Sequence, residues 1–447
     1  MSEICSVYMR VKAVNPCAPA HAFVPCGNCE ECQEVSRNAW AFRLGTELEI
    51  MKKRGWKIGF CTLTYRSKML PFFPVDVWTK PEEYREIPCF SRQDVTRFVH
   101  RLRKYLWKHF RIKAIRYMIC SEYGEHTQRP HYHALFCWPP VIDAVEMHRI
   151  IKALWYAEGF EYGFVFPLSP YGGKDSHGYE HKPFEVEGDG YNAAKYAAKY
   201  CCKDLHYMKT IEDLPLDRKS KLFKWCKPFH VQSRSLGLSL LDGLSDGEKL
   251  DLLLKGKSFV GRDKFVSLPL YLRNKIIFDT YYIFRPDGTR LVRRRANEFF
   301  DNHVEEIYNK KKEFYVNLLK QAMDSNFWVS RDLPRGMKPT DYPLCIQFDI
   351  DEWFSGSVDK AVDMYLSTYG VPKDRLFKVS PALQWYLRYD DKVDTSSLEL
   401  GYDPELVANA EIFWNWFFRH IVKTRSEAKQ DFKRKVNKVA DFHKSQE

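Results

Sequence analysis

The sequence predicts an α+β protein with a mainly antiparallel sheet. Residues 56–65 (WKIGFCTLTY) form an aromatic and β-branched run that is typical of a buried strand. Residues 115–123 and 129–138 are two further strand-like runs, and the turn-rich segment GEHTQ between them predicts a hairpin. A helical pattern lies between the first strand and this hairpin, and further helical and strand patterns follow it. The alternation of single strands, helices and a hairpin favours α+β over a parallel α/β fold.

The helices follow from apolar spacing and capping residues. Residues 35–53 predict a helix because Trp40, Leu44, Leu48 and Met51 recur every three or four positions. A second helix is expected to begin at Ser91, with Asp94 three residues later at the position that completes its cap. One apolar stripe runs along this second helix and consists of Val95, Phe98, Val99, Leu102 and Leu106.

The remaining elements complete three predicted regions. A helix is expected over about 145–157, a strand near EYGFVF (161–166), and a helix from about Tyr191 after a Gly-rich loop that ends at Gly190. Beyond about residue 245, helical stretches alternate, and no catalytic constellation is evident. We therefore expect a Cys-rich segment over 1–45, an α+β domain over 46–245 and a mostly helical region of unknown role, with DNA or a host protein as candidate partners, over 246–447.

Composition and charge restrict the class of protein. The chain has 447 residues, of which 45% are hydrophobic and 29% charged, as expected for a globular protein. There is no apolar run of about 18 residues, and the N-terminal residues lack the apolar block of a signal peptide, so we expect neither a membrane span nor export. Lys and Arg exceed Asp and Glu by 70 to 58, a net charge of +12 that favours a polyanionic partner, with nucleic acid foremost.

Four cysteines near the N-terminus have spacings that suit a metal. In NPCAPAHAFVPCGNCEEC, Cys26, Cys29 and Cys32 are separated by two-residue spacers, and Cys17 or His21 is the candidate fourth ligand. Four thiolates would hold a structural Zn²⁺ with no open position. The alternative is that these are incidental reduced cysteines in a loop. A disulfide framework is not expected, because the chain has 13 Cys, an odd number, and several lie singly in apolar stretches.

Basic residues are concentrated in three segments. Residues 91–118 hold nine Lys or Arg and one acidic residue, which favours contact with a DNA backbone. An arginine cluster at 285–295 and a basic tail at 419–447 are further candidates, and the plain alternative for them is a solvated helix face. The residues that we expect to contact DNA are Arg97, Arg101, Lys104, Arg129 and Arg234.

Two histidines in RPHYHALF are placed to bind a metal. His131 and His133 are two residues apart in a predicted strand and therefore project from the same face, although paired histidines are often only structural. Glu122, on the partner strand of the hairpin, can reach this face; Glu125 and His126 are the competing third ligands in the connecting loop. Two imidazoles and one carboxylate suit Mn²⁺ or Mg²⁺ and leave open positions for phosphate oxygens.

The segment GYNAAKYAAKYCCKD provides candidate nucleophiles. Residues 191–203 are predicted to be helical, which places Tyr196 and Tyr200 one turn apart on one face, with Lys199 and Lys203 three residues beyond each. A phenol with a pKa near 10 needs a cation to act as a nucleophile at neutral pH, and these lysines could offset the charge. Core packing is the alternative for two tyrosines at helical spacing.

FCTLTY, RPHYHALF and YxxxYxxK, in this order, resemble the three motifs of the HUH endonuclease superfamily, and the doubled tyrosine resembles rolling-circle replication initiators. VPCGNCEEC, NAWAFRLGTELE, HVQSRSLGLSL and LPLYLRNKIIF are similar to segments of the replication initiators of microviruses, in particular the gokushovirus branch. This resemblance covers about residues 17–280. The sequence departs from it at SRSLGL, where a Pro-Gly pair is expected after the Ser-Arg of Ser233 and Arg234.

The resemblance implies a ferredoxin-like or RRM-like HUH core and a metal-dependent, site-specific single-strand endonuclease and strand transferase. One of Tyr196 and Tyr200 would nick the phage origin and form a 5′-phosphotyrosine, and the strand would later be rejoined into a circle. The implied partners are single-stranded and supercoiled double-stranded phage DNA, host helicase and host DNA polymerase, in the cytoplasm of the bacterial host. The rival interpretations are a non-enzymatic basic nucleic-acid-binding protein with a zinc knuckle and a metal nuclease that activates water.

Overall fold

The structure is a computed structural model that describes residues 8–12, 21–25, 27, 30–72, 88–124, 129–157, 159–175, 178–188, 191–200, 227–259, 265–324, 338, 341–368 and, in short pieces, 405–417. The chain divides into two compact units. Residues 34–243 and 258–264 form one unit, called the sheet unit below, and residues 1–33, 244–257 and 265–447 form the other, called the helical unit.

The sheet unit is built on one five-stranded antiparallel sheet. Its strands are β3 (Lys57–Thr64), β4 (Arg116–Tyr123), β5 (Pro130–Trp138), β8 (Val165–Phe166) and β11 (His230–Gln232), in the order β11-β4-β5-β3-β8. The predicted strand at 56–65 and the predicted hairpin are thereby confirmed as β3 and as β4 with β5. The unit has an α+β fold, because its helices pack on an antiparallel sheet.

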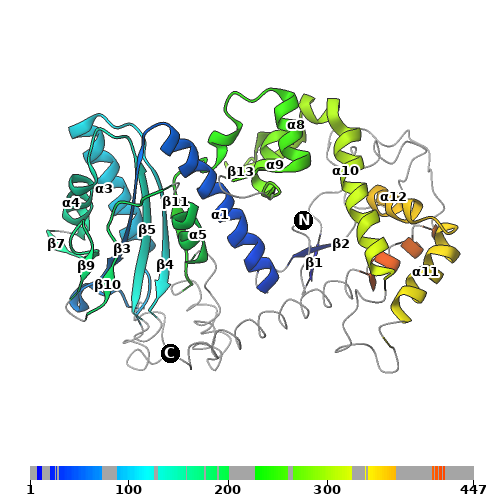
Figure 1. Ribbon diagram of the computed structural model, residues 1–447, viewed down its shortest axis with the longest axis horizontal. Coiled ribbons are helices and arrows are strands. Elements are labelled where there is room, and N and C mark those ends of the chain that lie inside the picture. Colours follow the sequence, from blue (N-terminus) through cyan, green and yellow to red (C-terminus); the bar gives the residue numbers. More distant parts are fainter. Residues whose placement is uncertain are drawn as a thin grey trace. The chain divides into compact units, whose positions relative to one another are not determined.

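Helices cover both faces of this sheet (Figure 1). One face packs against α3 (Arg92–Phe110) and α4 (Ala144–Leu154) through a core that includes Leu63, Tyr132 and Phe136. The other face packs against α1 (Glu30–Lys53) and α5 (Tyr191–Tyr200) through a second core that includes Met118 and Leu135. Successive strand residues alternate between the two faces, so the residues on both faces are largely apolar. Ser121, Glu122 and His133 are buried polar exceptions.

Capping side chains begin two of these helices, α3 and α4. Ser91 caps α3, because its hydroxyl accepts a hydrogen bond from the backbone N–H of Asp94 at 3.2 Å, as its sequence position predicts. Asp143 caps α4 in the same way through the N–H of Glu146 at 2.7 Å. Arg111 then ends α3 in the left-handed conformation, with φ 58°.

The helix expected over 145–157 ends early, at Leu154. Trp155 turns into the core instead and is fully buried, with its indole N–H donating to Thr64 O at 2.8 Å. The carbonyl of Leu154, at the end of the helix, has no partner within the helix. The guanidinium of Arg101 donates to this carbonyl and to the carbonyl of Tyr156. The tertiary contact therefore overrides the local helical pattern.

A buried carboxylate joins α1 to the segment that follows β11. Glu47 is fully buried and forms an ion pair with Arg116 at 2.5 Å. Its carboxylate also accepts the backbone N–H of Gly237 at 2.8 Å and the hydroxyl of Ser239 at 3.0 Å. Because each carboxylate oxygen is satisfied, the buried charge is stabilised and the segment after β11 is held against α1.

Short elements complete the sheet unit. They are η1 (Ser67–Met69), β6 (Tyr156–Ala157) paired with β7 (Phe160–Glu161), β9 (Gly173–Lys174) paired with β10 (Glu180–His181), and η3 (Leu238–Leu241).

The helical unit has its own core. Its elements are β1 (Tyr8–Lys12) paired with β2 (His21–Pro25), α8 (Asp246–Lys255), α9 (Leu270–Ile277), β12 (Phe278–Phe284) paired with β13 (Arg290–Ala296), α10 (Glu298–Ala322), α11 (Asp341–Phe354) and α12 (Val358–Thr368). Phe300, Tyr315, Ile346, Phe354 and Trp414 are among its buried residues.

Two features of this unit bear on the sequence predictions. The arginine cluster at 285–295 lies in the β12–β13 hairpin, so the helix face considered for it is wrong. Within the described residues, no helix combines the length and the apolar character that crossing a membrane requires.

Candidate metal centre

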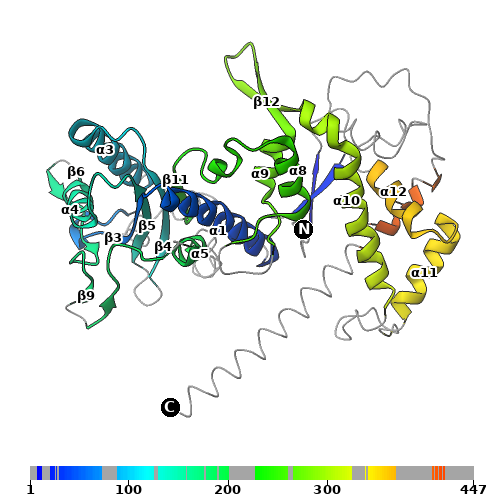
Figure 2. The same ribbon diagram turned by 45° about the horizontal axis from the view of Figure 1, so that its top comes forward.

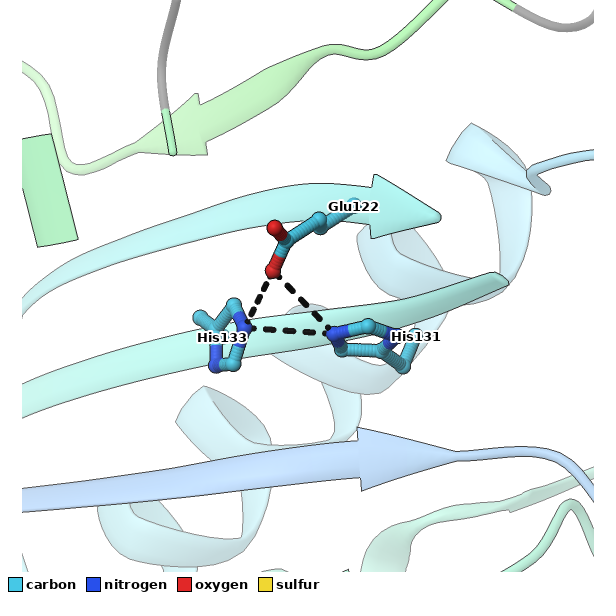
Figure 3. Close-up of side chains that lie close together, drawn as sticks. All are labelled: Glu122, His131 and His133. Carbon is cyan, nitrogen blue, oxygen red and sulfur yellow. Dashed lines mark hydrogen bonds and ion pairs between the residues drawn. The ribbon is translucent and has the colours of Figure 1, made fainter. Parts of the chain in front are cut away.

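Three potential metal ligands meet on the sheet face that packs against α1 and α5. Glu122 on β4 lies directly opposite His131 on β5, and His133 follows two residues later on the same face (Figure 3). The hairpin register thus brings together the three residues expected from the sequence. Glu122 and His133 are each 7% exposed, whereas the side chain of His131 is 19% exposed. The cluster is closed on most sides and open beside His131.

The three ligand atoms form a small triangle. Glu122 Oε2 lies 2.8 Å from His133 Nε2 and 3.3 Å from His131 Nε2, and the two imidazole Nε2 atoms are 3.2 Å apart. An ion about 2.1 Å from each ligand separates neighbouring ligands by about 3.0 Å in octahedral geometry and by about 3.4 Å in tetrahedral geometry. The donor set and its spacing therefore fit a divalent cation with three further positions on its open side.

Hydrogen bonds outside the triangle orient both imidazoles. His131 Nδ1 lies 3.2 Å from the carbonyl oxygen of Arg129, so Nδ1 carries the proton and Nε2 presents a lone pair to the cluster. His133 Nδ1 lies 3.2 Å from the hydroxyl of Thr62, which faces it from β3. Such partners fix the ring orientation and tautomer of metal-binding histidines.

An aromatic group lies beside the ligands. Phe60 stacks on the His133 ring, with centroids 5.8 Å apart and 19° between the planes. The ring of Tyr196 on α5 packs edge-on against Phe60 at 5.3 Å and against His133 at 6.0 Å. Tyr196 is nevertheless 46% exposed. A half-exposed phenol therefore lies next to one of the ligands.

The docking of α5 explains this position. Ala194 and Ala197 are fully buried against the sheet, and the thiol of Cys120 on β4 donates to the carbonyl of Ala197 at 3.6 Å. Small alanine side chains allow the helix to approach the strands closely. Tyr196, next to Ala197 in the helix, is then placed against His133, one of the three candidate ligands.

The other residues of the tyrosine motif are described less fully. The helix α5 includes Lys199 and Tyr200 in its backbone, while the placement of their side chains lies outside what is described. Lys203 lies outside the described residues. The helix expected over 191–203 is thus confirmed from Tyr191 to Tyr200.

Three other tyrosines of the sheet unit are unsuited to nucleophilic attack. Tyr65 and Tyr132 are buried, and their hydroxyls are 3.0 Å apart. Burial raises the pKa of both groups above the ordinary value. Burial and the neighbouring carboxylate of Asp94, which accepts a hydrogen bond at 2.9 Å, raise the pKa of Tyr162 to about 12. These phenols belong to the core on the opposite face of the sheet.

The candidate DNA-binding residues are dispersed. Arg97 and Lys104 are exposed on α3, which covers the sheet face opposite to the three ligands. Arg101 donates to backbone carbonyls, as described above, and Arg129 donates to Tyr65 O at 2.5 Å. Arg234 is exposed directly after β11. Contact of any of them with DNA stays a prediction.

The cysteine cluster lies mostly outside the described residues. This applies to Cys17, Cys26 and Cys29, whereas Cys32 lies in the first turn of α1 and is buried. The described part of the chain therefore does not test the zinc site.

Sequence reasoning missed Thr62 and Phe60. Both lie in the predicted strand 56–65 at alternate positions, so one signal for them was present. Their proximity to His133 depends on the pairing of β3 with β5, which puts Thr62 opposite His133. Both also fall in FCTLTY, one of the three motifs of the resemblance, but the contact of Thr62 with His133 across 71 residues of sequence depends on that pairing.

Two comparisons with known proteins find similarity to replication-associated proteins. Residues 58–205 match a family model of replication-associated proteins of the ORF2 type. The chain is also 28% identical over 182 residues to the replication-associated protein ORF2 of Spiroplasma virus 4, over 41% of this chain. The match covers 48% of that relative, so the chain spans about half of its length. No solved structure matches the chain. The family model therefore matches the segment that contains the three candidate ligands and α5, and the relative is a viral replication-associated protein.

Proposed function

We propose that this protein initiates rolling-circle replication of a viral genome by nicking one DNA strand through attack of a tyrosine. The observation that carries the proposal is the packing of the Tyr196 ring against His133. His133 belongs to the set of two histidines and one glutamate that could hold a metal ion. The similarity of residues 58–205 to replication-associated proteins supports the same activity. The net charge of +12 suits a DNA substrate.

The topology supports an HUH-type core. The elements β3, α3, β4, β5, α4 and β8 follow one another in the chain, and the four strands pair in the order β4-β5-β3-β8. This strand order is the one expected for the split β-α-β arrangement of a ferredoxin-like core, and it supports the proposal. The two histidines occupy the central strand β5 of the sheet.

The side chains have distinct roles in the proposed reaction. Glu122, His131 and His133 would hold Mn²⁺ or Mg²⁺, which when bound withdraws negative charge from a phosphate oxygen. Thr62 keeps the His133 ring in position, and the carbonyl of Arg129 fixes the proton of His131 on Nδ1.

The phenol oxygen of Tyr196 or Tyr200 attacks phosphorus and loses its proton. The bond from phosphorus to the 3′ oxygen breaks, and this oxygen takes up a proton as a free 3′-OH. Lys199 and Lys203 offset negative charge near the phosphate. The energy of the phosphodiester remains in the 5′-phosphotyrosine, so resealing needs no nucleotide.

Two tyrosines allow successive rounds of replication. When extension of the 3′-OH by host polymerase regenerates the origin, one tyrosine is still linked to DNA. The other, four residues away on the same helix face, attacks the new origin, and the released 3′-OH attacks the old link. We place this activity in the cytoplasm of the bacterial host, with a host helicase to separate the strands.

The cysteine cluster completes the proposal. We expect one structural Zn²⁺ per chain at Cys17, Cys26, Cys29 and Cys32. Elemental analysis of purified protein would show about one zinc per chain, and protein without zinc would refute the assignment.

The test is nicking of the double-stranded circular viral genome in Mn²⁺, followed by denaturing electrophoresis. We expect open circles and label that remains on the protein after boiling in detergent. His131→Ala should abolish nicking and retain DNA affinity, since phosphate contacts dominate binding. Tyr196→Phe and Tyr200→Phe should each retain initial nicking, and the double variant should not nick.

The outcomes separate the rival functions. Nicking without a covalent link would indicate a nuclease that activates water. If the wild-type protein binds DNA without nicking it, and His131→Ala binds DNA with the same affinity, the protein is a non-enzymatic binding protein. Continued release of unit-length circles by either single tyrosine variant would contradict the alternation of the two tyrosines.

A further inference from the structure

The hairpin of β12 and β13 in the helical unit is a basic ribbon that lies outside the residues matched by the family model. It spans residues 278–296 and is called the arginine hairpin below. Figure 2 shows it extending away from α8, α9 and α10 of the same unit. Its base is anchored by the buried Ala296 and by Phe278, which packs against Phe300 with ring centroids 6.4 Å apart.

The turn holds the two strands together at the tip. Arg285 N donates to Thr289 O at 2.9 Å, and Gly288 adopts the positive φ of 76° that the turn requires. Asp287 accepts hydrogen bonds from the backbone N–H and the hydroxyl of Thr289 at 2.8 and 2.6 Å. The carboxylate therefore bonds within the turn, and within the described residues it forms no ion pair with the arginines of the hairpin.

The hairpin carries unbalanced positive charge. Five arginines stand against two aspartates, Asp279 and Asp287. None of the five forms an ion pair with any residue in the described parts of the chain. The arginines are Arg285, Arg290, Arg293, Arg294 and Arg295.

Strand pairing distributes these groups over two faces. Arg290 is opposite Phe284, and Val292 is opposite Tyr282, so alternation puts Tyr282, Phe284, Arg290 and Arg294 on one face, called the aromatic face below. Arg293 and Arg295 lie on the other face. The guanidinium of Arg290 lies over the ring of Tyr282, 4.3 Å from its centroid.

The aromatic face is open to solvent. Phe284 is 73% exposed and Tyr282 is 49% exposed, an unusual position for large aromatic side chains beside exposed arginines. Such aromatic rings bind the faces of nucleic-acid bases, and arginines next to them bind phosphates. In a duplex each base face is covered by its neighbours, so only unpaired bases present a face to these rings.

We propose that the aromatic face of the arginine hairpin binds single-stranded nucleic acid. Bases stack on Phe284 and on Tyr282 with its overlying Arg290, and Arg290 and Arg294 contact the phosphates. This binding is independent of the candidate metal centre, which lies in the other unit.

The test measures binding of the full chain to fluorescein-labelled oligothymidine of about 20 nucleotides by fluorescence anisotropy. Chelator in the buffer removes any contribution that depends on the metal. Arg290→Gln with Arg294→Gln should weaken binding about tenfold and reduce the slope of log affinity against log salt by about 1.4, which is about 0.7 per lost phosphate contact. Phe284→Ala should weaken binding at least about fivefold and leave that slope unchanged, because stacking releases no counterions.

The matched control is Arg293→Gln with Arg295→Gln, which removes the same charge from the opposite face of the same hairpin. We expect this variant to bind within about twofold of wild type, since single-strand contacts lie on the aromatic face. Thermal melting followed by circular dichroism should be the same for wild type, Phe284→Ala and the double variant of Arg290 and Arg294, because these three side chains are exposed. Equal losses in the two double variants, an unchanged affinity of Phe284→Ala, or tighter binding to a duplex of the same length would each overturn the proposal.

Discussion

Replacing Thr62 by valine tests whether the hydrogen bond from Thr62 to His133 supports metal binding, and it leaves all three candidate ligands in place. Valine has nearly the volume of threonine but lacks the hydroxyl that lies 3.2 Å from His133 Nδ1. Since His133 is only 7% exposed, water cannot readily replace this partner. An unsatisfied buried polar group costs about 1–3 kcal/mol, which corresponds to about 5-fold to 150-fold in an equilibrium constant.

The geometry places the effect in the lower part of this range. A separation of 3.2 Å is at the long end for a hydrogen bond, and Phe60 still stacks on the His133 ring. We therefore expect Thr62→Val to weaken Mn²⁺ binding about tenfold, in line with the effect of other outer partners of metal ligands. Isothermal titration calorimetry of metal-free protein with Mn²⁺ gives the dissociation constants.

Thr64→Val is the matched control. Thr64 lies on the same strand and face, but its hydroxyl bonds the backbone of Phe164, with distances of 3.1 and 3.2 Å, and no metal ligand. It should bind Mn²⁺ as wild type does. If folded Thr62→Val binds Mn²⁺ as tightly as wild type does, the role of Thr62 is refuted. If the wild-type protein does not bind Mn²⁺, the assignment of Mn²⁺ to this site is refuted.

Three further changes test the sheet unit. Glu47→Ala should lower the free energy of unfolding by about 3–5 kcal/mol in urea denaturation, because it leaves Arg116 without its buried partner; a loss below about 1 kcal/mol would contradict this. Gly163→Ala should destabilise by about 3 kcal/mol in the same assay, since its Cβ would overlap the carbonyl of Thr64; wild-type stability would show that the backbone shifts freely. Burial lowers the pKa of His148 below its ordinary 6.5, so as the pH falls below 6.5 the unfolded chain gains a proton that the folded chain does not, and stability falls. His148→Phe should flatten this slope between the lowered pKa and pH 6.5, and an unchanged slope would exclude His148 as its source.

Much of the candidate metal centre was predictable because it depends on local geometry. Residues two apart in a strand share a face, which is enough to pair His131 with His133. A hairpin joins neighbouring strands through a short segment, so Glu122 could be placed near them before any register was known. The cap of α3 at Ser91 is local in the same sense, since its bond spans three residues.

The helical pattern of α5 was also visible in the sequence, whereas its docking was not. Spacing of four residues places Tyr196 and Tyr200 on one face of any helix. Which face meets the sheet is decided by burial of Ala194 and Ala197 against it. That packing gives Tyr196 its position beside His133.

By itself, the sequence determined β3, the hairpin of β4 and β5, and the pair of histidines, because strand alternation and helix periodicity act within a few residues. Only the tertiary structure decided that Thr62 lies opposite His133, that Trp155 ends α4, and that the arginine cluster forms a hairpin. These outcomes depend on contacts between residues distant in sequence or on competition between helix and strand. Their energies come from burial and pairing in the assembled fold, which no local pattern encodes.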